Sequence, residues 1–79
     1  MKPGDLVTPE EWLKETLLYS RRFVMAGDES RAISGRLRVG EVGIVVGTNK
    51  RSWSVMVITP RGELGWTGQR TLAYVARTK

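Results

Sequence analysis

The sequence contains no cysteine and no histidine. Without these residues the chain forms no disulfide and lacks the ligands of the commonest zinc sites. It cannot assemble a Ser-His-Asp or Cys-His catalytic group, and it has no imidazole to act as a base near neutral pH. The eight acidic residues show no paired spacing typical of acid–base catalysis. We therefore predict a protein that is not an enzyme and needs no cofactor or metal.

Long apolar runs are also missing. No segment approaches the roughly 18 consecutive apolar residues of a membrane-spanning helix, and Met1 is followed by polar residues rather than by a signal segment. We expect synthesis in the cytoplasm and no membrane partner. The 79 residues suffice for one domain with a thin core. Association with copies of itself or with a larger assembly is then an expected source of stability.

Acidic residues are scarce in the second half of the chain. Residues 31–79 carry nine basic and two acidic side chains, a net charge of +7, whereas residues 1–30 have a net charge of −2. A strongly basic domain suits nucleic acid or an acidic protein surface as partner. The same arginines also keep a small β-rich protein soluble, and composition does not separate the two interpretations.

A helix start is the clearest local pattern. Thr8 is suited to the N-cap, Glu11 completes a capping box, and Pro9 occupies the first helical position. The following residues place an apolar-to-small face at helical spacing. We therefore predict a helix over residues 9–20 that packs on the rest of the domain, its own or a neighbour's, with Trp12 as its anchor.

The remaining sequence predicts short strands separated by turns. Gly43 is expected to mark a bend or bulge, and Gly62 to take a left-handed conformation in its turn. The expected elements are a turn and strand at 1–7, a polar loop at 26–35, an alternating segment from 36 leading into a strand at 42–46, a hairpin loop at 47–52, strands at 53–58, 63–67 and 72–76, a turn at 59–62, and a 3₁₀ turn at 68–71.

The strand expected at residues 53–58 is largely apolar at both its odd and its even positions. Such a strand is covered on both faces, as in a small closed barrel or at a subunit contact. The predicted helix and a second subunit are the two candidates for covering its outer face.

Residues 34–75 contain an ordered set of glycines, tryptophans and apolar residues. The set is Ser34-Gly35-Arg36-Leu37, Gly40-Glu41, Val45, Trp53, Val55, Gly62, Gly65-Trp66 and Leu72. In this pattern the segment resembles bacterial SH3-type domains. With the opening Lys-Pro-Gly-Asp-Leu-Val, the pattern is similar to short stand-alone proteins of tailed bacteriophages. The resemblance implies a mainly β fold, a small SH3-like barrel of about five strands, as a single domain over residues 1–79 with a helix and loop insertion at 8–34.

The resemblance implies a structural or interaction protein, found in the host cytoplasm or in the virion, that self-associates or docks on other virion proteins. The alternative function is a nucleic-acid-binding barrel that uses the basic half of the chain. A plasmid-borne type of dihydrofolate reductase also forms SH3-like barrels from chains of this length. Its Val-Gln-Ile-Tyr active-site strand is absent here, where residues 63–66 read Glu-Leu-Gly-Trp.

Tryptophans with basic residues near them on turns are the candidate interaction sites, for stacking on bases or for gripping a peptide. A core or groove-lining role is the competing interpretation for Trp66, and a solvated turn is the competing interpretation for the Lys50-Arg51 pair. The full set of candidates is Trp53, Trp66, Trp12, Arg36, Arg38, Lys50, Arg51 and Arg61.

Overall fold

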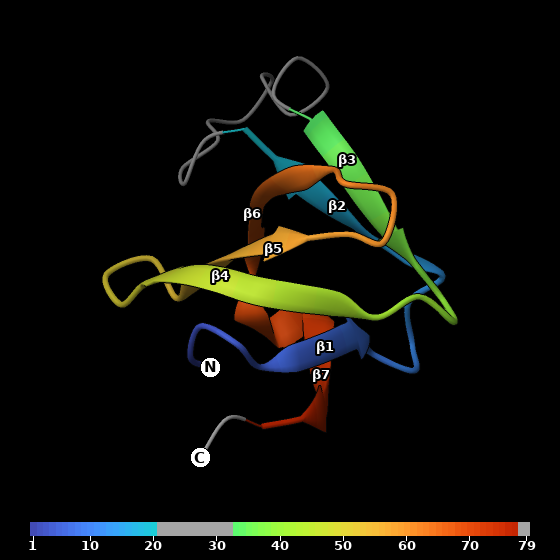
Figure 1. Cartoon of the computed structure of the whole chain (residues 1–79), viewed down its shortest axis with the longest axis horizontal. Helices are drawn as coiled ribbons and strands as arrows, with labels where there is room; N and C mark the ends of the chain where they lie inside the picture. The colour runs from blue at the N-terminus through green and yellow to red at the C-terminus, as the bar shows by residue number, and fades with distance from the viewer. Residues whose placement is uncertain (21–32, 78–79) are drawn as a thin grey trace.

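The computed structural model of the chain describes residues 1–20 and 33–77. These residues form one antiparallel sheet of seven strands and one 3₁₀ turn (Figure 1). The prediction of a mainly β fold is confirmed, but the prediction of about five strands is wrong. The elements are β1 (Leu6–Pro9), β2 (Glu15–Tyr19), β3 (Ile33–Arg38), β4 (Gly43–Asn49), β5 (Ser54–Ile58), β6 (Leu64–Gly68), η1 (Gln69–Thr71) and β7 (Leu72–Ala76).

The strands are hydrogen-bonded in the order β3-β2-β6-β5-β4-β1-β7. The sheet curls on itself, because β1 near one end of this order also contacts β3 at the other end. In Figure 1, β4 and β5 lie side by side with β1 below them, and β2 and β3 lie above β5. The strands therefore enclose a core between them.

The core takes one or two apolar side chains from each of six strands. Successive side chains of a strand point to opposite faces, so every second residue is buried. In β6 the inward positions are Gly65 and Thr67, so this strand contributes no large side chain. The buried apolar residues are Val7, Leu18, Leu37, Val45, Val55, Val57 and Leu72.

The helix predicted over residues 9–20 is wrong. Thr8 and Pro9 end β1 and pair with Ala73 and Leu72 of β7. The hydroxyl of Thr8 donates to the carbonyl oxygen of Glu41, 2.9 Å away, and not to a helix N-terminus. Pro9 is the last residue of β1. It pairs with β7 only, because β1 pairs with β4 at Leu6 and Val7. One side of the strand is therefore open at Pro9, and such a position tolerates its missing N–H group.

Residues 15–19 form a strand because a two-residue burial period fits them better than a helical one. Thr16 and Leu18 are buried, and the residues between them are only partly so. All five residues of β2 pair with β3, from Glu15 opposite Arg38 to Tyr19 opposite Ile33, with a register shift between Leu18 and Tyr19. Pairing over the whole strand outweighs the local capping pattern, because helix propensity is a weak preference that tertiary contacts override.

Several of the predicted turns are confirmed. The turn at 59–62 is present with Gly62 at φ 85°, the 3₁₀ turn is Gln69–Thr71, and β7 ends at the expected residues. The bulge expected at Gly43 is instead a register shift between Val45 and Gly47. The hairpin loop is shorter than expected because β4 continues to Asn49. Of the loop predicted at 26–35, residues 33–35 belong to β3 and residues 26–32 lie outside the described residues.

The β2–β3 hairpin packs against β6 at glycine positions. A Cβ atom at Gly65 would lie 2.8 Å from Cβ of Leu18 and 3.0 Å from the carbonyl oxygen of Tyr19. Gly35 is similarly close to Glu63, with a Cβ-to-Cβ distance of 2.6 Å. These distances are shorter than van der Waals contact, so β2, β3 and β6 can approach only where side chains are missing.

We therefore expect Gly65→Ala to lower the free energy of unfolding by about 2 kcal/mol, because the added methyl group forces β2 away from β6. Gly68→Ala is the matched control on the same strand. Nothing lies within 4 Å of a Cβ at Gly68, and its φ of −70° suits alanine. Urea unfolding of both variants measures the difference. Equal stability of the two variants would contradict the close-packing argument.

Candidate interaction surfaces

Trp53 is held out from the surface at the end of the β4–β5 hairpin. Its side chain is 68% exposed, and its backbone has φ 52°, the positive-φ residue other than glycine in the described part of the chain. A bulky residue in this conformation is strained, and such strain is concentrated at functional sites. The amide of Gln69 donates to the carbonyl oxygen of Trp53 at 3.0 Å, which ties the hairpin to η1.

Short polar contacts shape the rest of this loop. The amide of Arg51 donates to Oδ1 of Asn49 at 3.0 Å, and Oγ of Ser52 donates to Oγ of Ser54 at the same distance. Asn49 is also paired with Ser54 across the hairpin. These contacts hold the loop at its first residues and at its last ones, and the turn that they form sets the backbone conformation of Trp53.

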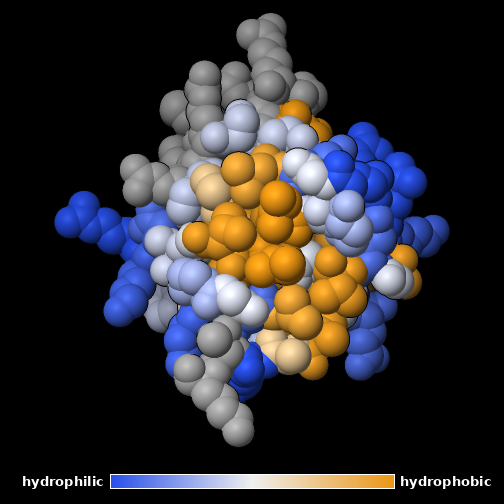
Figure 2. Space-filling view, viewed as in Figure 1, coloured by the Kyte–Doolittle hydropathy of each residue, from blue (hydrophilic) through white to orange (hydrophobic). Residues whose placement is uncertain are grey.

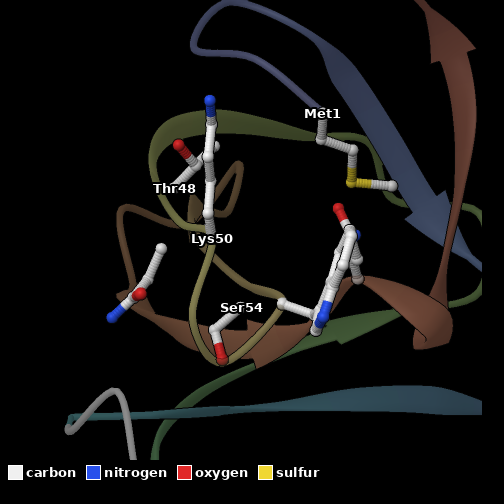
Figure 3. Close-up of a pocket in the computed structure, with 7 residues that line it drawn as sticks. Met1, Thr48, Lys50 and Ser54 are labelled. Carbon is white, nitrogen blue, oxygen red and sulfur yellow. The ribbon is translucent and has the colours of Figure 1, made fainter.

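A hollow of about 310 Å³ lies beside Trp53 (Figure 3). A second hollow, of about 410 Å³, shares Met1 and Gln69 with it. We call the two together the Trp53 groove. The first hollow is lined by Met1, Thr48, Asn49, Lys50, Trp53, Ser54 and Gln69, and the second by Met1, Glu10, Gln69, Leu72, Ala73 and Tyr74.

Met1 lines both hollows, and the N-terminal turn that carries it is fixed to β4. Gly4, with φ 96°, donates its amide to the carbonyl oxygen of Val45 at 2.7 Å. The amide of Lys2 donates to Oδ2 of Asp5 at 2.8 Å. Met1 itself packs against the apolar core. Both hollows are therefore lined by a flexible apolar side chain on a fixed backbone.

The groove combines apolar walls with charge of opposite sign at its two ends. Lys50 lines the first hollow, near Trp53, and Glu10 lines the second, near Tyr74. In the described part of the chain, Lys50 makes no ion pair. A groove that combines apolar and aromatic side chains with several polar groups can position an extended ligand.

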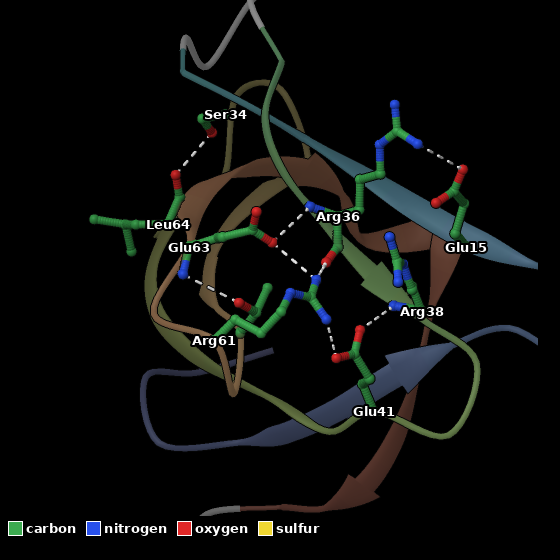
Figure 4. A network of polar contacts seen from close by, with 9 residues as sticks. Glu15, Ser34, Arg36, Arg38, Glu41, Arg61, Glu63 and Leu64 are labelled. Atoms are coloured by element: carbon green, nitrogen blue, oxygen red, sulfur yellow. Dashed lines mark hydrogen bonds and ion pairs between the residues drawn. The ribbon is translucent and has the colours of Figure 1, made fainter.

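A polar cluster at the other end of β5 from Trp53 is built around Arg61, in the turn between β5 and β6 (Figure 4). Its guanidinium forms ion pairs with Glu41 and Glu63, the latter at 2.8 Å, and donates to the carbonyl oxygen of Arg36. The two carboxylates in turn accept the amides of Arg36 and Arg38, at 3.3 and 2.8 Å. The cluster thereby joins β3 to the turns that precede β4 and β6.

The cluster changes the acidity of its members. The hydrogen bond from Arg61, and then that from the amide of Arg36, lower the pKa of Glu63 below its usual value of 4.5. The same hydrogen bond with Glu63 is the largest cause that raises the pKa of Arg61. Both side chains are therefore charged at neutral pH and form an ion pair with each other.

Because the pKa of Glu63 is lowered in the folded state, its contribution to stability is present above pH 4.5 and is lost as the pH falls below that value. Glu63→Gln is therefore expected to lower the melting temperature at about pH 7 and to have a smaller effect at about pH 3. Thermal denaturation at both values measures this. The exposed Glu11, changed to Gln, is the control. A Glu63→Gln effect that is independent of pH would contradict the ion-pair assignment.

Trp66 lies on the outward side of the sheet, not in the core. It is opposite Met56 in the β5–β6 pair. Its Cη2 atom is 3.9 Å from the position of a Cβ at Gly47, so the indole crosses β5 and reaches β4. Around it, most outward residues of these three strands are apolar, and Figure 2 shows an apolar patch on the side of the molecule that faces the viewer, where β4 and β5 lie in Figure 1. We call this patch the outer apolar face, formed by Ile44, Val46, Met56, Ile58, Leu64 and Trp66.

The basic candidate residues lie in different parts of the surface. Arg61 is in the polar cluster, and Arg36 pairs with Glu15 at 3.7 Å. The side chain of Arg38 points outward on β3 without an ion pair in the described part of the chain. Lys50 and Arg51 lie beyond the opposite end of β4.

Trp12 anchors no helix, since residues 10–14 form turns and its side chain is 71% exposed. Sequence reasoning missed Met1 and Gln69 as groove residues, because the hollow depends on the meeting of the N-terminal turn with η1. It also missed Ile44 and Val46, although the two-sided apolar pattern of residues 53–58 indicated an outer face of this kind.

Residues 1–20 and 33–77 contain no cluster of acidic side chains able to hold a metal ion. They also contain no helix long and apolar enough to cross a membrane. Comparison with known proteins gives no match: no family, no curated protein and no solved structure is significantly similar to this chain.

Proposed function

We propose that the chain is a non-enzymatic protein-interaction module whose Trp53 groove binds an extended segment of another protein. The observation that carries this proposal is the strained and exposed Trp53 beside a groove of apolar and polar residues. A large aromatic side chain at the edge of a hollow is the typical anchor of a protein interface. The opposite charges of Lys50 and Glu10 favour a ligand with an acidic and a basic group at its two ends.

We further propose that the fold is related to the SH3-like barrels. The order β7-β1-β4-β5-β6, with an insertion after β1 and a 3₁₀ turn before β7, supports this relationship. The β2–β3 hairpin then takes the place of the helix expected in the insertion. With the resemblance of residues 34–75 to phage proteins, this leads us to propose a virion component or accessory protein that docks on a larger assembly.

The groove is tested with peptides selected from a random library against the wild-type protein. Trp53→Asn is expected to weaken their binding at least about tenfold, because the anchor is lost. Its melting temperature should not fall, since asparagine tolerates positive φ better than tryptophan. Titration calorimetry and thermal denaturation give the two values.

Trp12→Asn is the matched control, because Trp12 is as exposed as Trp53 and lines neither hollow. Its peptide affinity should equal that of the wild type. Peptides that bind Trp53→Asn as tightly as the wild type, or that are lost equally from both variants, would overturn the groove assignment.

A second candidate function is binding of single-stranded nucleic acid at the same hairpin. Lys50 and Arg51 flank the exposed Trp53 and make no ion pair in the described part of the chain. A base can stack on such an indole while the two cations contact phosphates. Arg61 of the polar cluster is less suited to this role, because it already forms ion pairs with Glu41 and Glu63.

This function predicts a shift of a labelled oligonucleotide at about 50 mM salt that disappears steeply towards about 200 mM. Lys50→Ala with Arg51→Ala should reduce the salt dependence by about one to two counterions. Lys14→Ala is the control on a different surface. Absence of any shift at the low salt concentration excludes this candidate.

A further inference from the structure

The outer apolar face consists of two rows of side chains that cross the strands. In the first row, Ile44 of β4 is opposite Ile58 of β5, which is opposite Leu64 of β6. In the second row, Met56 is opposite Trp66, with Val46 at the register shift of β4 beside them. The exposed fractions of Ile44, Val46 and Leu64 are 44%, 45% and 46%. Figure 2 shows an apolar patch on this side of the molecule, which continues towards the lower right of the view and is bordered elsewhere by more polar residues.

The sheet does not require apolar residues on its outward side. The outward residues of β3 are Ser34, Arg36 and Arg38, which is the usual alternation of a strand with one face in water. In β4, β5 and β6 the outward positions of the face hold no charged residue. The contrast within one sheet indicates that the face on these three strands meets a partner and not solvent.

The size of the face fits a small interface. Three strands of five to seven residues give a footprint of roughly 20 by 15 Å from strand spacing and rise. This is the apolar centre of a contact near the lower end of the stable range, about 1,200 Å² in total. The expected affinity for a partner of the same size is in the micromolar range, about 1–100 µM.

The two ends of the face differ in charge. At one end, Arg61 pairs with Glu41 and Glu63, and Arg38 lies in the same cluster and also acts on Glu63, so cations and carboxylates are matched there. At the other end, the β4–β5 hairpin carries Lys50 and Arg51, which make no ion pair in the described part of the chain. A second copy that lies across the face with its strands reversed keeps the two basic hairpins at opposite ends, whereas a copy in the same direction would bring these like charges together. A two-fold axis produces the reversed arrangement.

We propose that two copies of this chain pack through their outer apolar faces, β4 against β4 in opposite directions, as an isologous dimer. The inference rests on the proposed role as an interaction module and adds a second copy of the chain as the partner on a surface separate from the Trp53 groove. In this dimer the outer apolar face of each copy is buried against that of the other. The thin core of a small domain gains stability from this burial.

The test is analytical ultracentrifugation from about 1 to 500 µM protein, which spans the expected affinity. The wild type should pass from the 8.9 kDa chain to twice that mass. Val46→Lys should remain a monomer throughout, because it places a charge at the middle of β4 in both copies. Val75→Lys is the matched control. Val75 is a 52% exposed valine on β7, outside the face, and its variant should dimerise like the wild type.

Cross-linking keeps the test independent of folding effects. The chain has no cysteine, so Val46→Cys and Val75→Cys each introduce one thiol. A short bis-maleimide should link Val46→Cys into dimers and leave Val75→Cys as monomers. A wild type that is monomeric at the highest concentration, a dimer that survives Val46→Lys, or the reverse cross-linking pattern overturns the proposal.

Peptide binding separates this proposal from that of the groove. The Val46→Lys monomer should bind the peptides selected on the wild type with unchanged affinity, because Val46 lines neither hollow. Loss of the dimer with intact peptide binding assigns the two surfaces different roles. Dimerisation without any peptide binding would remove the groove function and leave the dimer in place.

Discussion

The β2–β3 hairpin meets β6 through bare backbone at Gly65, and the shape of the molecule depends on this contact. Leu18 enters the core only because no side chain at residue 65 stands in its way. With the hairpin in place, Leu37 of β3 completes the core and the Arg61 cluster forms between β3 and the neighbouring turns. A protein without disulfides achieves a closed core in this way, by close packing at positions that carry no side chain.

The surface of the sheet divides according to what each part meets. The β3 strand presents polar side chains to water, whereas β4, β5 and β6 present apolar ones. The arginines near the polar strand are largely neutralised by carboxylates, so the net positive charge of the chain overstates its free basic surface. Lys50 and Arg51, which make no ion pair in the described part of the chain, lie beside the strained Trp53. The surfaces suited to binding a partner are therefore the β4–β5 hairpin and the outer apolar face.

The pattern of residues 36–76 was informative because each strand there has a local signature. Alternation around Leu37, the glycine of the turn at 62 and the β-branched residues of β4 and β5 all indicate the elements that form. The helix predicted over residues 9–20 was wrong because the capping pattern of Thr8, Pro9 and Glu11 is local. The strands that form instead, β1 and β2, pair with β7 and β3, which lie far away in the sequence. The positions of Met1 and Gln69 around the groove likewise depend on contacts between distant parts of the chain.

Composition and periodicity by themselves determined the absence of disulfides and of histidine chemistry, the β-rich character of the second half, and the presence of an apolar strand with two faces. The tertiary structure alone decided that the insertion after β1 is a hairpin, that Trp66 lies on the outward side of the sheet and that Trp53 is exposed. It also decided that Arg36 and Arg61 each form an ion pair with a glutamate. The reason is physical. Period and turn residues act between neighbours in the chain, whereas burial and ion pairing depend on which strands the sheet brings together.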